Sequence, residues 1–172
     1  MAEKNKTVKP VEVLTDDKMR DLFGTNYSNI IYYNYDKGAW NRNEYLGYDL
    51  TVANHMTSQY WAPAVKGIID REYANIELVA CVVMMIEAQD YKRGGAIVKS
   101  PHFDPLGTAF VGNVVYRNRR SHKIAPIGSD WICAGHFVYP DRAAMSVGEF
   151  LHQLAFNAKF RHTLMDVKVR RK

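Results

Sequence analysis

Between residues 114 and 127 the sequence VVYRNRRSHKIAPI gathers side chains that could bind anions. Two apolar, β-prone runs flank a short polar segment, a pattern that predicts a β-hairpin. Arginine can contact a phosphate through two parallel N–H donors, whereas lysine contacts it as a point charge. We therefore predict a phosphate-binding hairpin whose contact residues are Arg117, Arg119, Arg120, His122 and Lys123.

The charge of the whole chain is distributed unevenly. The 172 residues carry a formal net charge of +5, but residues 1–90 hold 9 Lys and Arg against 13 Asp and Glu, whereas residues 91–172 hold 14 against 5. Such a basic half is typical of proteins that bind nucleic acid or another acidic partner. The alternative is a solubilising surface with a charged hairpin tip that discourages strand pairing. Two further basic clusters are candidate nucleic-acid contacts: Lys92 with Arg93, and Arg170, Arg171 and Lys172.

The segment 27–48 is unusually rich in tyrosine and asparagine. Aromatic side chains in such a segment can stack on unpaired bases or form a protein interface. They can equally cover the core, with their hydroxyl groups facing water. The candidate base-stacking or interface residues are Tyr32, Tyr33, Tyr35, Trp40 and Tyr45.

Motifs for metal or nucleotide chemistry are scarce. The sequence contains no phosphate-binding loop ending in Gly-Lys-Ser/Thr, no G-x-G-x-x-G, no H-E-x-x-H and no C-x-x-C. Cys133-x-x-His136 and His102-x-Asp104 could together supply four zinc ligands. However, residues three apart on a strand point to opposite faces, which argues against a shared metal. We therefore expect no metal and no cofactor.

An enzymatic role remains an alternative. His55-Met56-Thr57 resembles one half of the paired H-x-T motifs of two-histidine phosphoesterases, and the chain has no second H-x-T. Six histidines offer general acid or base groups, and the arginines could stabilise a phosphorane-like transition state. A small nuclease or phosphodiesterase is thus a hypothesis, with no catalytic residue assigned.

The predicted organisation is a single α+β domain over residues 14–163, between a flexible basic arm (1–13) and a basic tail (164–172). Thr15 is a suitable N-cap for a helix over 16–23, which Gly24 would end. Pro63 is placed to begin a second helix that continues to about residue 74.

The apolar segment 76–93 suits either a third helix or a buried central strand, because periodicity alone does not separate the two. Asn75 could cap a helix and Gly94-Gly95 could end it, so we favour the helix. Short apolar runs bounded by turn residues then predict an antiparallel β-meander over residues 96–140. A capping box at Ser146–Glu149 is expected to begin a closing helix.

The cysteines and the N-terminal residues indicate a reducing compartment. Cys81 and Cys133 both lie inside apolar runs and are expected to be buried free thiols. The N-terminal residues lack an apolar leader, and the apolar run that contains Glu77 and Glu87 is too short to span a membrane. We therefore expect a cytoplasmic protein, in a host cytoplasm or virion if the source is viral, with no membrane partner.

These features favour a small basic protein that binds RNA or single-stranded DNA through the phosphate backbone, in an accessory or packaging role. Tyr- and Asn-rich basic chains of this size also suit viral or phage structural subunits, by analogy alone. A self-assembling subunit of the capsid or tail type, forming a homo-oligomer through segment 27–48, is the second hypothesis.

Overall fold

A computed structural model describes residues 10–42, 44–45, 48–49, 60–87, 98–99, 108–128, 131–137 and 143–165. Within this part of the chain one sheet has the strand order β2-β1-β5-β7-β9-β6, and β8 pairs with β7 beside that path. Its pairings are antiparallel, apart from the parallel pair β6–β9. The predicted α+β class is confirmed, and in the second half β7 pairs antiparallel with β8 and β9 as predicted, whereas β6 pairs in parallel with β9. The strands are β1 (Ile30–Asn34), β2 (Ala39–Trp40), β5 (Ile76–Glu87), β6 (Val98–Lys99), β7 (Thr108–Asn118), β8 (Ile124–Pro126) and β9 (Trp131–Phe137), with a separate pair β3 (Glu44–Tyr45) and β4 (Tyr48–Asp49).

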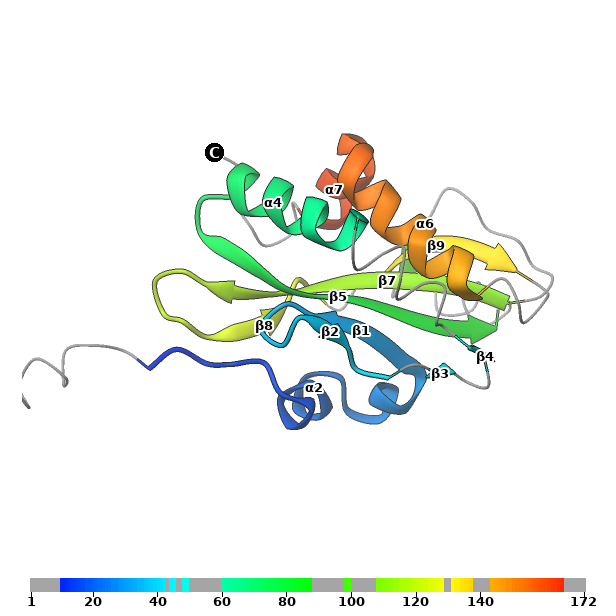
Figure 1. Cartoon of the computed structure of the whole chain (residues 1–172), viewed down its shortest axis with the longest axis horizontal. Helices are drawn as coiled ribbons and strands as arrows, with labels where there is room; N and C mark the ends of the chain where they lie inside the picture. The colour runs from blue at the N-terminus through cyan, green and yellow to red at the C-terminus, as the bar shows by residue number, and fades with distance from the viewer. Residues whose placement is uncertain are drawn as a thin grey trace, which may run out of the picture.

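Helices cover both faces of the large sheet (Figure 1). Alternate side chains of strand β1 point to opposite faces of the sheet: Ile30 and Tyr32 pack in one core cluster, and Ile31 and Tyr33 pack in the other. The first cluster also contains Met19 of α2, and the second contains side chains of the other three helices. The helices are α2 (Asp16–Phe23), α4 (Ala62–Glu72), α6 (Ala143–Phe156) and α7 (Ala158–Met165), with a short 3-10 helix η1 (Gly24–Asn29) after α2.

The helix favoured for residues 76–93 is wrong over the described part, where β5 runs from Ile76 to Glu87. Its side chains alternate between the two core clusters: Cys81 and Val83 face one, and Val82 and Met84 face the other. A strand buried on both faces reads as a continuous apolar run, without the alternation that marks a half-buried strand. Residues 88–93 lie outside the described residues.

The N-terminal helix follows its sequence signals closely. The Thr15 hydroxyl accepts a hydrogen bond from the backbone N–H of Lys18 at 3.1 Å, and Asp16 and Asp17 occupy the first turn. Gly24 ends the helix with φ 55°, a left-handed conformation that favours glycine. The prediction of a capped helix over residues 16–23 is confirmed.

The closing helix begins earlier than predicted. Helix α6 already starts at Ala143, so the expected capping box at Ser146–Glu149 lies inside the helix and does not cap it. Asn157 then separates α6 from α7, and its side-chain oxygen accepts a hydrogen bond from Phe160 N at 3.1 Å. This Asx-type cap lets the chain begin a second helix, whose Leu164 and Met165 are buried.

The residues that flank the predicted domain also make ordered contacts. Glu12 donates its backbone N–H to His122 O at 3.1 Å, and its carboxylate accepts Ile124 N at 2.7 Å. Leu14 N donates to Asp36 Oδ2 at 2.9 Å. Glu12 therefore lies against the β7–β8 hairpin and Leu14 is bonded to the turn after β1. Residues 1–9 and 166–172 are outside the described residues, so the predicted arm and tail boundaries stay predictions.

Cys81 is free and fully buried in β5. Burial raises the pKa of its thiol to about 12, although the Tyr35 hydroxyl, 3.7 Å from Sγ, acts in the opposite direction. The expected buried thiol is thus confirmed for Cys81, and the side chain of Cys133 lies outside the description. None of the helices in the described ranges has the length and apolar character needed to cross a bilayer.

Helices α4 and α7 are joined by an ion-pair cluster. Both carboxylate oxygens of Glu72 accept from the guanidinium of Arg161, at 3.2 and 3.0 Å, and His162 Nε2 also contacts Glu72. Burial alone would raise the pKa of Glu72, but the hydrogen bonds from Arg161 and His162 outweigh it, so this pKa lies below its usual 4.5. The contacts of Glu72 with Arg161 and His162 therefore stabilise the fold at pH values above the pKa of Glu72 in the unfolded state. This stabilisation is lost as the pH falls through the pKa of Glu72 in the folded state.

Glu72→Gln should test this cluster. We expect the free energy of unfolding to fall by about 1–3 kcal/mol at pH 7, because the variant removes hydrogen bonds to charged groups. The difference in unfolding free energy between the variant and the wild type should narrow as the pH falls from about 5 to about 3, because wild-type Glu72 itself becomes protonated. Urea unfolding across this range measures both effects, with Glu149→Gln, an exposed acid on α6, as the control. Parallel pH profiles for Glu72→Gln and the wild type would contradict the assignment.

Candidate nucleic-acid interface

The turn between β7 and β8 is fixed by hydrogen bonds of the side chain and backbone of Asn118. Asn118 Oδ1 accepts from Arg120 N at 2.8 Å and Ser121 N at 2.9 Å, and Asn118 N donates to Lys123 O at 2.9 Å. His122 adopts φ 62°, a left-handed conformation that non-glycine residues adopt rarely. Asparagine is well suited to this kind of side-chain to backbone turn. The cations of the turn are therefore presented on an ordered loop.

Little of the predicted hairpin extends beyond the sheet. Strand β7 is an interior strand of the sheet, and its pairing with β5 continues as far as Ile76 opposite Asn118. The backbone N–H of Arg119 also donates to Asn75 O at 3.0 Å. Only residues 119–123 extend beyond this pairing, and we call them the basic turn.

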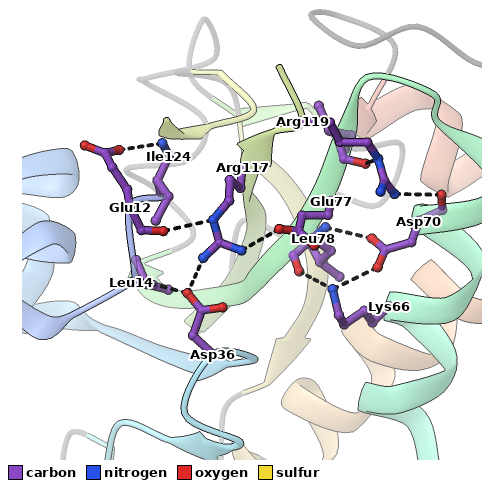
Figure 2. A network of polar contacts seen from close by, with 11 residues as sticks. Glu12, Leu14, Asp36, Lys66, Asp70, Glu77, Leu78, Arg117, Arg119 and Ile124 are labelled. Carbon is purple, nitrogen blue, oxygen red and sulfur yellow. Dashed lines mark hydrogen bonds and ion pairs between the residues drawn. The ribbon is translucent and has the colours of Figure 1, made fainter. Parts of the chain in front are cut away.

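Arg117 does not belong to the exposed surface. Its side chain is directed into the network of Figure 2, and the residue is only 6% exposed. Nη1 donates to Glu77 Oε1 at 2.5 Å, Nη2 to Asp36, and Nε to Glu12 O at 2.9 Å. The two carboxylates neutralise the guanidinium, and their hydrogen bonds raise its pKa despite burial. The predicted phosphate contact by Arg117 is therefore wrong: this arginine is an internal ion-pair partner.

Arg119 has a different environment. Its guanidinium donates to two backbone carbonyls, Ile76 O at 2.7 Å and Asp70 O at 3.1 Å (Figure 2). The second carbonyl lies in the last turn of α4, where helix carbonyls lack intrahelical partners and a positive charge is favoured. Carbonyl groups do not cancel the charge of Arg119. The residue is exposed and retains N–H donors for an external anion.

Arg120 and Lys123 are exposed, and neither forms an ion pair within the described part of the chain. The charge of Lys123 also acts on Glu12. The hydrogen bond from Ile124 N is the main cause that lowers the pKa of Glu12, and the charge of Lys123 contributes least. His122 is half-buried between these cations. The structure thus brings Arg119, Arg120, His122 and Lys123 together in the basic turn and separates Arg117 from them.

Most of the proposed stacking aromatics are core residues. Tyr32 is fully buried, and Tyr33 and Trp40 are each 8% exposed. The Tyr35 hydroxyl donates to Ala62 O at 2.5 Å, and burial raises its pKa well above the ordinary value. Bases have no access to such rings, so the stacking role is wrong for Tyr32, Tyr33 and Trp40. The side chain of Tyr45 lies outside the description.

Sequence reasoning missed a different set of aromatic residues, beside the start of α4. The rings of Trp61 and His152 lie 5.6 Å apart, and those of His152 and Phe156 lie 5.0 Å apart. Tyr60 and Phe156 are 64% and 62% exposed. One sequence signal was present, because His152 and Phe156 are four residues apart on α6 and lie off its apolar stripe. We call these four residues the aromatic patch.

The remaining candidates lie outside the description: Lys92, Arg93, Arg170, Arg171 and Lys172, and the histidines His55 and His102. Within the residues that the structure does describe, no three His, Cys, Asp or Glu side chains are grouped to hold a metal ion. Comparison of the chain with family models, with curated proteins and with solved structures found no match. The assignment of function therefore depends on the geometry alone.

Proposed function

We propose that this protein binds nucleic acid through the phosphate backbone, with the basic turn as a contact surface. One observation carries the proposal: Arg119, Arg120 and Lys123 are exposed together on an ordered turn and have no carboxylate partner among the described residues. Cations placed in this way displace counterions from a phosphate backbone, which supplies affinity that does not depend on sequence. An accessory or packaging role in a cytoplasmic setting belongs to the same proposal, and the buried free thiol of Cys81 supports the reducing compartment.

The salt dependence of binding tests the proposal. Arg120→Ala/Lys123→Ala removes two cations that make no ion pair in the described structure, so the fold should be preserved. For a single-stranded 12-mer of thymidine, the slope of log K against log salt should become shallower by about 1.4, since each phosphate contact contributes about 0.7. Fluorescence anisotropy between 50 and 200 mM KCl measures this slope.

A matched control removes the same charge elsewhere. Arg20→Ala/Lys37→Ala deletes one arginine of α2 and one lysine of the turn after β1, both exposed. Its slope should equal that of the wild type, because neither side chain belongs to the basic turn. If both double variants change the slope equally, binding depends on net charge and the basic turn is not the contact site.

The other hypotheses gain no specific support from the described contacts. Self-assembly was assigned to segment 27–48, whose side chains Tyr32, Tyr33 and Trp40 are buried. Nuclease or phosphodiesterase chemistry would need a histidine beside a bound phosphate, and His162 instead contacts Glu72. Both hypotheses remain proposals of lower rank.

A further inference from the structure

The outward face of α4 connects the basic turn to the aromatic patch. Ala62, Val65 and Ile69 face the core, whereas Tyr60, Gly67 and Arg71 form a stripe on the opposite side. Ala64, between Tyr60 and Gly67, packs partly against the core. Arg119 binds the carbonyl of Asp70 at the C-terminal end of this helix. Tyr60, the first residue of the stripe, lies two residues before Ala62, where the helix begins. Helix α4 therefore separates the two surfaces by its own length, about 16 Å for eleven residues.

The stripe carries positive charge between its two ends. Arg71 is exposed, and its Nη1 lies 3.3 Å from the position that a Cβ on Gly67 would take, so its side chain folds back along the helix. The acids of α4 are engaged elsewhere: Asp70 pairs with Lys66 at 2.8 Å, and Glu72 pairs with Arg161 at 3.0 Å. No carboxylate in the described ranges pairs with Arg71. An anion that follows α4 therefore meets two arginines without a carboxylate partner among the described residues: Arg119 at the C-terminal end, and Arg71, whose Nη1 reaches back from the last turn to Gly67.

The aromatic patch presents ring surface to solvent at the far end of this path. Tyr60 and Phe156 are more than half exposed. The ring of Phe156 packs against His152, whose ring in turn contacts Trp61. Bases stack on exposed aromatic rings regardless of sequence, because every base has a π-face. In a duplex, neighbouring base pairs cover these faces. The patch therefore complements unpaired bases.

Building on the proposed function, we propose that the nucleic acid bound is single-stranded and follows α4. Its phosphates contact the basic turn and Arg71, and its bases stack on the exposed rings of Tyr60 and Phe156. The order of the surfaces supports this arrangement: cations at one end, a cation over the smooth surface of Gly67 in the middle, and aromatic rings at the other end. Combining a cationic track with aromatic rings is the usual way in which proteins bind single strands without sequence preference.

The test compares a labelled thymidine 12-mer with a 12-base-pair dA·dT duplex by fluorescence anisotropy. Tyr60→Ala/Phe156→Ala should weaken binding of the single strand by at least about fivefold and leave its salt slope unchanged, because stacking contributes affinity without releasing counterions. Duplex binding should not change. Tyr60→Phe/Phe156→Tyr, which keeps both rings, should bind like the wild type. Val11→Ala/Val13→Ala, two exposed apolar side chains on the N-terminal segment, provides the matched control.

The outcomes separate the two proposals. If Arg120→Ala/Lys123→Ala reduces the slope while Tyr60→Ala/Phe156→Ala leaves affinity unchanged, the stacking inference is wrong and the proposed function stands. If the wild type binds neither the single strand nor the duplex, both the proposed function and the stacking inference are wrong. Light scattering supplies a third outcome: a dimeric wild type that becomes monomeric in Tyr60→Ala/Phe156→Ala would make the patch an interface between two copies and overturn the inference.

Discussion

Arg117→Ala should lower the free energy of unfolding by about 3–5 kcal/mol, the range measured when one partner is removed from a buried ion pair. The guanidinium is 6% exposed and holds Asp36, Glu77 and the backbone of Glu12 together. Its removal leaves two carboxylates without their counter-charge and removes one of the three hydrogen bonds that hold Glu12 to the hairpin. Urea unfolding at pH 7, followed by circular dichroism, measures the loss.

Arg120→Ala is the matched control, since it removes the same side chain from an exposed position three residues away. Its unfolding free energy should stay within about 0.5 kcal/mol of the wild type. A loss below about 1 kcal/mol for Arg117→Ala would contradict the account, because the ion pairs would then contribute little and Arg117 would be available to an external phosphate.

Gly112→Ala should be the second strongly destabilising change. A Cβ at position 112 would lie 2.1, 2.4 and 2.5 Å from three ring atoms of Phe150. The ring is fully buried between β7 and α6 and cannot move aside. Overpacking of this kind costs about 1–3 kcal/mol, and the severity of the overlap places the expected value at the upper end. Chemical denaturation gives the free energy directly.

A double-mutant cycle separates this clash from a general intolerance of side chains at position 112. Phe150→Leu alone should be destabilising because it removes buried ring surface. In Gly112→Ala/Phe150→Leu the smaller side chain makes room for the new methyl group, so the two losses should sum to more than the loss of the double variant. Strictly additive losses would mean that Phe150 is not what excludes a side chain from position 112.

Local signals in the sequence predicted much of the first part of the fold. The Thr15 cap and the Gly24 stop each depend on residues that are close in the sequence, and both are present. Strand β5 was misread because both of its faces are buried, and burial on both faces is a property of the assembled sheet. Asn75, directly before β5, suits the start of a strand as well as the start of a helix.

Only part of the candidate site was predicted, because the rest depends on contacts between segments that are distant in the sequence. Arg117 and Arg120 look alike in the sequence, but the pairing of β5 with β7 sets Arg117 opposite Glu77. Its two acidic partners are 40 and 81 residues away, so no local pattern could reveal that this charge is neutralised. The basic turn was predictable because its exposure follows from the turn residues alone. The aromatic patch forms only when α4 and α6 pack together, and sequence reasoning missed it.

The location of nucleic-acid contacts tests the central claim most directly. Backbone amide resonances of isotope-labelled protein can be followed by NMR while the thymidine 12-mer is added at low salt, where phosphate contacts are strongest. The account predicts the largest shifts at residues 119–123, with little change at Arg20 and Lys37. Measurable binding that leaves residues 119–123 unshifted would contradict the claim that the basic turn contacts the phosphate backbone.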